Sequence, residues 1–205
     1  MQRLLWLGLL VLTSWGALGW WGQRPLHPPP GVLAGQPPDQ VDLEDGALLQ
    51  RGDTTLRTRA HIALTARVLS REDYRWDPGA SLAPTDLALG WGRMSDSAVL
   101  AGIRIRQADR FFYWHVRQFP IPRREIETSA SNMHLIPADE GVRYAISHVR
   151  EGELVHIEGF LVDASRPDGW HWHTSLRRDD TGDGACELVY VEELEPVAPR
   201  AQMGR

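Results

Sequence analysis

The sequence predicts a mostly β (α+β) domain, a small Greek-key barrel of the OB type with one helix, preceded by an N-terminal transmembrane helix. Three observations predict it. The chain opens with a long uncharged apolar stretch, the residues from Leu56 onward alternate between apolar and polar, and one amphipathic stripe stands between groups of strand-like runs. With 205 residues and 42% hydrophobic content, the chain is long enough to pack one domain and some additional segments.

The first expected element is a membrane anchor in residues 1–24. Leu4 to Gly22 carries no charge and is long enough to span about 30 Å of hydrocarbon as a helix. Trp20 and Trp21 stand at its far end, where interfacial aromatic residues are common. A cleaved signal peptide is the alternative, because Ala17 and Gly19 form a small-x-small site, although Trp20 is a poor residue to follow a cleavage site.

Three further segments follow the anchor. Residues 25–53 are rich in Pro, Gly and Asp, a composition typical of a stiff spacer that holds a domain off the membrane. Residues 54–196 form the expected OB-like domain, and residues 197–205 form a disordered tail.

The domain begins with a long, half-buried strand in residues 56–70, where apolar residues from Leu56 to Val68 share one parity and polar residues share the other. Residues 70–102 contain several Pro and Gly and predict an irregular insertion, with Ser95 as the cap of a short helix. Residues 103–107 and 110–116 predict two strands joined by a tight turn at Ala108-Asp109.

A helix is expected next, because Val142, Ala145, Ile146 and Val149 form one apolar stripe, with Asp139 at its start and Gly152 at its end. Three strands follow, in residues 153–164, 169–176 and 186–194, and Gly159 marks a bulge or a close approach of two backbones. This order matches an OB barrel with one additional strand, and an α+β sandwich is the alternative.

Four segments resemble an uncharacterised bacterial family of membrane-anchored hypothetical proteins, and the resemblance covers roughly residues 60 to 195. These segments are "LALGWGRMSDSAV", "SNMHLIPAD", "VREGELVHIEGFLVDA" and "GWHWHTSLRRDDTGDGACELVYVE". The resemblance implies a single-pass anchor with one outer domain and carries no activity or cofactor. We therefore expect a protein of the bacterial inner membrane with its C-terminal domain in the periplasm. The single cysteine excludes an internal disulfide framework, which is compatible with that compartment.

The cysteine, Cys186, is a candidate nucleophile, and His134 is a candidate base. The carboxylates around Cys186 would raise the pKa of a thiol, which disfavours the reactive thiolate. A lone cysteine that enters a strand is also commonly a small buried residue. Both interpretations stay open.

Two sets of residues are candidate metal ligands. His171 and His173 share one face of an expected strand, at a spacing that suits a transition metal. Asp179 and Asp183 belong to an acidic loop that resembles a calcium loop, but Tyr190 stands where the bidentate Glu is required. The alternatives are an ordinary Trp-in, His-out strand and a tight glycine-containing turn.

A stretch rich in arginine and aromatic residues is the candidate binding surface. Together with the polar-to-apolar segment that follows it, it supplies Arg104, Arg106, Trp114, Arg117, Arg123, Arg124, Asn132 and His134. Such a composition can bind single-stranded nucleic acid. The net charge of −5 and the absence of lysine argue against nucleic acid and favour an anionic ligand or an envelope protein.

The sequence therefore predicts a membrane-anchored periplasmic binding or accessory module. It contacts the inner membrane through its N-terminal helix and needs no cofactor. The alternative is a hydrolase that uses Cys186 and His134 or a bound metal ion.

Overall fold

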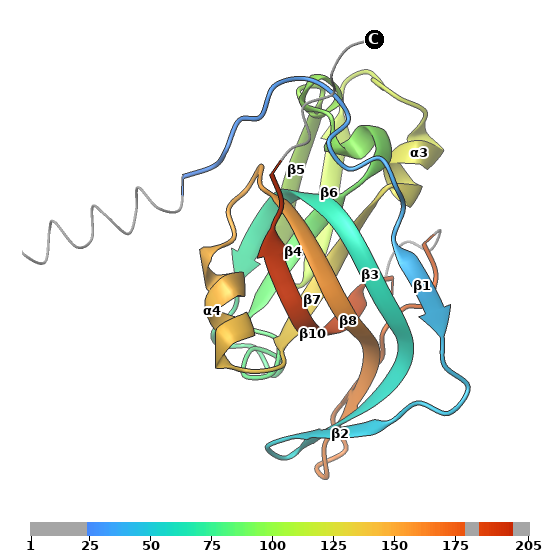
Figure 1. Cartoon of the computed structure of the whole chain (residues 1–205), viewed down its shortest axis with the longest axis vertical. Coiled ribbons are helices and arrows are strands. Elements are labelled where there is room, and N and C mark those ends of the chain that lie inside the picture. The colour runs from blue at the N-terminus through green and yellow to red at the C-terminus, as the bar shows by residue number, and fades with distance from the viewer. Residues whose placement is uncertain (1–23, 179–184, 199–205) are drawn as a thin grey trace, which may run out of the picture.

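The structure, a computed structural model, describes residues 24–178 and 185–198. Its described part is mostly β (Figure 1). The longest strand, β3 (Thr54–Asp73), pairs antiparallel with β4 (Thr85–Gly90) on one side and with β8 (Leu154–Ser165) on the other. The mostly β prediction is confirmed.

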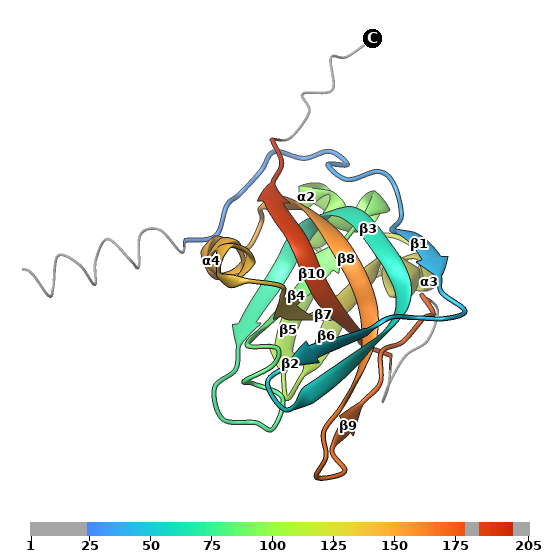
Figure 2. The ribbon, with the colours of Figure 1, turned by 60° about the horizontal axis from the view of Figure 1, so that its bottom comes forward.

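The strand pairings close into a ring. β4 pairs antiparallel with β7 (Ala130–Pro137), β7 runs parallel to β10 (Glu187–Pro196), and β10 pairs antiparallel with β8, which returns to β3. Figure 2 shows these strands wrapped around a common interior. The sheet is therefore mixed, with its one parallel pair between β7 and β10.

Apolar residues of one parity from each ring strand fill the interior. On β3, the alternation predicted from the sequence is confirmed, because Leu56, Ile62 and Val68 are buried while Arg57 is exposed. Helix α4 (Glu140–His148) packs its predicted stripe onto this core through Val142, Ile146 and Val149.

Two local predictions about this region are also confirmed. The Asp139 side chain caps α4 by accepting the Val142 N–H at 2.8 Å. Gly159 is a close-approach point, because a Cβ there would lie 2.0 Å from the Tyr190 carbonyl oxygen. The β8–β10 register shifts beside this contact, between Val191 and Glu193.

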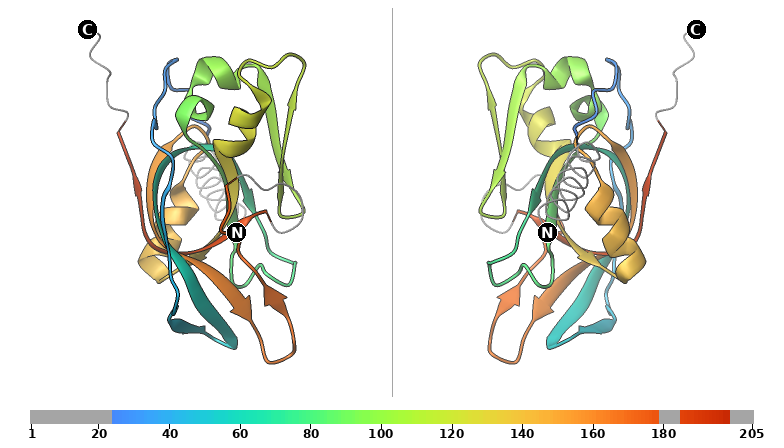
Figure 3. Two further views of the ribbon diagram at one scale, coloured as in Figure 1. Left: turned by 90° about the vertical axis from the view of Figure 1, so that its right-hand side faces the viewer. Right: turned by 90° about the vertical axis from the view of Figure 1, so that its left-hand side faces the viewer.

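The assignment of the ring strands was wrong in one respect. β5 (Ile103–Ala108) and β6 (Phe111–Val116) pair with each other in a separate two-stranded sheet. Figure 3 shows this hairpin as a layer beside the ring. The ring positions expected for these strands are taken by β4, which lies in the segment predicted to be irregular, and by β7, which includes "SNMHLIP".

The chain between β4 and β7 contains three short helices besides the hairpin: η1 (Gly92–Ser95), α2 (Ser97–Leu100) and α3 (Arg123–Thr128). Asp96 caps α2, where Ser95 was expected. Asp109 and Arg110 form the hairpin turn with φ of 53° and 70°, one residue later than predicted.

The segment predicted to be a spacer is packed against the domain. β1 (Asp39–Asp42) and β2 (Leu48–Arg51) both pair with β3, and Ala34 is buried beside Trp91 and Leu154. This segment, rich in Pro and Gly, lies along the surface of the ring. Its composition was therefore wrongly interpreted as that of a spacer that holds the domain off the membrane.

The last strands also differ from the prediction. β9 (His171–Trp172) is short and pairs with β8, so residues 169–176 form no regular ladder with β10. One backbone bond joins the two segments, from Ser175 N–H to the Cys186 carbonyl at 3.0 Å.

Among the described residues, no helix has the length and apolar character needed to cross a membrane. Residues 1–23 of the predicted anchor (residues 1–24) and residues 199–205 of the predicted tail (residues 197–205) lie outside the described residues.

Candidate functional site

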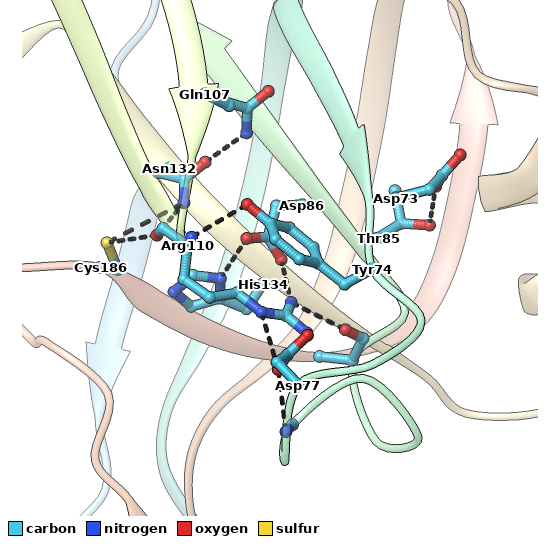
Figure 4. A network of polar contacts seen from close by, with 12 residues as sticks. Asp73, Tyr74, Asp77, Thr85, Asp86, Gln107, Arg110, Asn132, His134 and Cys186 are labelled. Atoms are coloured by element: carbon cyan, nitrogen blue, oxygen red, sulfur yellow. Dashed lines mark hydrogen bonds and ion pairs between the residues drawn. The ribbon is translucent and has the colours of Figure 1, made fainter.

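A buried polar network joins the β5–β6 hairpin to the outer face of β4 and β7 (Figure 4). Gln107 on β5 donates to Asn132 Oδ1 on β7 at 2.6 Å, and Asn132 Nδ2 donates to the Arg110 carbonyl at 2.9 Å. Asn132 is only 4% exposed, because the hairpin covers it. The network therefore fixes the hairpin on the ring.

Arg110, in the hairpin turn, lies at the centre of this network. Its guanidinium contacts both oxygens of Asp77 at 2.9 Å and Asp86 Oδ1 at 2.7 Å. It also lies 3.8 Å from the centre of the Tyr74 ring. Its side chain is 14% exposed, and a buried guanidinium of this kind depends on such partners.

Tyr74 contacts Arg110 in a second way, because its hydroxyl oxygen accepts the Arg110 backbone N–H at 2.9 Å. Burial raises the pKa of the Tyr74 phenol, and the bond from the Arg110 N–H opposes that rise only in part. The phenol therefore stays neutral to a higher pH than an exposed tyrosine.

His134 lies in the same layer, paired in register with Asp86. Its Nδ1 is 2.9 Å from Asp86 Oδ2, although the two groups are not aligned as a hydrogen bond requires. The imidazole packs on Trp172, with ring centres 4.5 Å apart. At 2% exposure, His134 lies in the core of this layer and not on a binding surface.

Cys186 enters the network from the start of β10. Its Sγ lies 3.6 Å from the Arg110 carbonyl and 4.0 Å from Asn132 Nδ2. In the β7–β10 ladder, His134 is paired with Leu188, so Cys186 is level with Asn132. Two residues of strand, about 7 Å, therefore separate Cys186 from the candidate base, whereas a nucleophile and its base need hydrogen-bond contact.

A small cleft of about 170 Å³ lies next to Cys186, between Phe112 and Trp114 of the hairpin and the first residues of β7. The Glu187 carboxylate, 1% exposed, accepts from Ser131 and from Arg178 beside this cleft. The volume of the cleft is smaller than the 300–1,000 Å³ common for small-molecule sites.

The candidate metal ligands do not form a complete site in the described residues. The rings of His171 and His173 are 5.3 Å apart, and His173 Nδ1 is 3.4 Å from Asp163. No group of three His, Cys, Asp or Glu side chains in residues 24–178 and 185–198 is arranged to hold a metal ion. Asp179 and Asp183 lie outside the described residues.

The predicted binding residues divide between the two faces of the hairpin. Arg104 and Arg106 lie on the exposed face beside Tyr113, and Arg117 follows β6 on the same side. Trp114 faces the ring with the apolar cluster of the hairpin. Asn132 and His134 lie beneath the hairpin, so the expected groove between them and the arginines is not formed.

The other two arginines lie on α3. Both are exposed, and Arg123 donates to Glu127 at 2.7 Å and lies 5.8 Å from the centre of the Trp114 ring. Arg124 stands next to it. The arginines of α3 and of the hairpin thus form a basic surface, defined here as Arg104, Arg106, Arg117, Arg123 and Arg124.

A groove of about 740 Å³ lies within this basic surface. It is formed by residues 101–104 and 115–120, and Arg104, His115 and Arg117 line it together with Phe119. Among the described residues, no carboxylate lines the groove. An anionic group that entered it would meet cations and no like charge.

Sequence reasoning missed Arg110, Asp77, Asp86 and Tyr74. One signal was available: Asp86 is the one charged residue within the apolar run "TDLALG", and a buried carboxylate requires a partner. The partner, Arg110, belongs to the arginine-rich stretch but was not singled out from it.

A scan against models of protein families finds no match to the chain. Searches of curated proteins and of solved structures find none either.

Proposed function

We propose that the ring is an OB-type barrel and that the protein is a membrane-anchored binding module of the bacterial envelope, with its domain in the periplasm. The strand order supports the barrel. In chain order, the ring reads first, second, third, fifth and fourth strand, with the parallel pair between the third and the fifth. Helix α4 lies between the third and fourth strands, as the OB arrangement requires.

The ligand surface is the basic surface on the hairpin and α3, and its ligand is anionic. One observation carries this proposal: Arg104, Arg106 and Arg117 are exposed and form no ion pair with any described residue. Other arginines, such as Arg71 and Arg93, are paired with carboxylates.

The aromatic residues on this surface strengthen the proposal. Tyr113 is 45% exposed and Phe119 is 49% exposed. Arginine and tyrosine are enriched where a few residues supply most of the binding energy of an interface. A basic patch on a chain of net charge −5 also steers an anionic partner towards this face.

The usual ligand face of an OB barrel lies over its second and third strands. Here those strands are β4 and β7. The hairpin covers them, because its Arg110 bonds to Asp86 on β4 and its Gln107 bonds to Asn132 on β7. The hairpin thus replaces the ordinary ligand face with a new outer surface. This arrangement supports a binding role for the hairpin.

The test is a titration of the full chain in detergent with three anionic probes: polyglutamate, a sulfated glycan and mixed micelles that contain phosphatidylglycerol. We expect at least one probe to bind with an affinity that falls as salt rises. The R104Q/R106Q/R117Q variant should bind it at least tenfold more weakly. The control R57Q/R75Q/R143Q removes the same charge from other exposed parts of the surface and should bind normally.

The same titration tests whether Cys186 takes part in ligand binding. Cys186→Ser should bind as the natural chain does, because Cys186 lies under the hairpin and away from the basic surface. If no probe binds, or if the hairpin variant binds equally well, the proposal is wrong.

A further inference from the structure

The groove of 740 Å³ lies at the open end of the β5–β6 hairpin, away from the turn at Arg110. Arg104 lies on β5, Arg117 directly follows β6, and both line the groove. Phe119, half-exposed, contributes an aromatic ring. Two guanidinium groups can bind a phosphate in a bidentate manner, and no carboxylate in residues 24–178 and 185–198 lines this groove to compete with it.

The chain that leads from the predicted anchor is bonded to the helix beside this groove. The Ser97 hydroxyl donates to the Pro28 carbonyl at 2.7 Å, and the Gly31 N–H donates to Asp96 Oδ1 at 2.8 Å. α2 ends at Leu100, and the next residue, Ala101, lines the groove. The segment from Arg24 crosses the same end of the molecule as α2 (Figures 1 and 2).

These bonds limit the distance between the groove and the bilayer. Pro28 is six residues from Gly22 (28 − 22), the last residue of the predicted span. Six extended residues reach at most about 20 Å. A further bond, from Leu26 N–H to the Glu151 carbonyl at 2.7 Å, holds the chain against the domain even earlier. An anchor that ends at Gly22 would therefore hold the domain near the membrane surface.

We propose that the groove binds the phosphate of an anionic lipid headgroup in the same membrane that holds the anchor, so that the domain lies on the bilayer. The proposal rests on the proposed function, because it names the anionic ligand of the basic surface. Each arginine near an anionic bilayer raises the affinity of a protein for that bilayer about fivefold. An aromatic residue at the rim suits the interfacial region.

Hydrogen exchange of the full chain in lipid nanodiscs tests this proposal. One set of discs contains phosphatidylcholine alone, and the other also contains phosphatidylglycerol. We expect the amides of residues 101–106 and 115–120 to exchange several-fold more slowly in the anionic discs. R104Q/R117Q should remove the difference, and R57Q/R75Q, which carries the same charge change elsewhere, should preserve it.

Two further arms identify the source of the anion. Glycerol phosphate and polyglutamate are added separately to the phosphatidylcholine discs, and neither should protect the groove as the anionic lipid does. Equal exchange in both kinds of disc, or equal protection by glycerol phosphate or polyglutamate, would overturn the lipid proposal. Polyanion binding in detergent that is lost in R104Q/R106Q/R117Q would still support the proposed function, so the two failures are distinguishable.

Discussion

At the scale of single residues, Arg110 determines whether the hairpin stays on the ring. The Asp86 carboxylate is fully buried and depends on the guanidinium for charge compensation. Asp77, on the loop between β3 and β4, binds the same group. One side chain therefore joins the hairpin turn, that loop and a ring strand, and its loss leaves a buried charge without its cation.

Replacing Arg110 with Met should lower the free energy of unfolding by about 3–5 kcal/mol, because Asp86 would keep its burial and lose its cation. Arg106→Met, on the exposed face of the same hairpin, should change it by less than about 0.5 kcal/mol. Urea unfolding followed by tryptophan fluorescence measures both. Equal stability of the two variants would show that the network contributes little.

The pKa of the Tyr74 phenol is raised by burial, so its contribution to stability has a predictable pH dependence. The folded-state pKa lies above the unfolded value of about 10, so the contribution is complete below pH 10 and is lost as pH rises through the folded-state pKa. The tyrosinate absorbance of the natural chain minus that of Tyr74→Phe should show a midpoint above about 10. A midpoint at or below that value would contradict the buried phenol.

At the scale of elements, the contact between β8 and β10 depends on a glycine. A Cβ at Gly159 would lie 2.0 Å from the Tyr190 carbonyl oxygen and 3.2 Å from the Glu192 N, both backbone atoms that cannot move without opening the ladder. Gly159→Ala should therefore cost about 3 kcal/mol or more. Gly35→Ala meets its nearest atom at 4.0 Å and should be nearly neutral. Thermal unfolding of both variants decides the matter, and a neutral Gly159→Ala would refute the close approach.

Ser95 attaches the N-terminal segment to the domain. Its Oγ accepts the N–H groups of Leu33 and Ala34, each at 3.0 Å, and donates to the Gly92 carbonyl at 2.7 Å. Ser95→Ala should cost about 1–3 kcal/mol, because buried donors lose their acceptor. Amide exchange of residues 31–34 should accelerate, whereas Ser147→Ala, on the exposed side of α4, should leave it unchanged. Unaltered exchange in Ser95→Ala would mean that other contacts hold the segment.

The elements that the sequence predicted well are those with one buried face. β3 and α4 each place apolar residues on one side, and their periods of two and 3.6 are visible in the letters. β4 and much of β7 are buried on both sides, so their residues show no alternation. The β5–β6 hairpin alternates as a ring strand would, and an alternating pattern does not say which strands pair.

The candidate site was predicted in part for the same reason. The arginines of the basic surface are visible as a composition, and three of them lie exposed on one side of the hairpin. Asn132 and His134 were assigned to that surface because their segment carries no charge. This segment carries no charge because it is buried beneath the hairpin. The contact between the hairpin and β7 joins residues more than 20 positions apart in the sequence.

At the scale of the whole molecule, the two ends of the hairpin have different roles. The turn, through Arg110, fixes the hairpin on the ring, and the open end carries the groove with Arg104 and Arg117. The N-terminal segment is bonded to α2 at that same open end. Under the proposed function, this arrangement would keep the basic surface near the membrane that holds the anchor.

One measurement tests the central claim most directly: a hydrogen-exchange map of the full chain with and without a saturating anionic probe, over all the described residues. Binding of the probe to the basic surface predicts slower exchange confined to β5, β6 and residues 115–120, with the exchange of the network around Cys186 unchanged. Protection that centres on Asn132, Cys186 and the small cleft, with the outer face of the hairpin unaffected, would contradict the account and move the functional site beneath the hairpin.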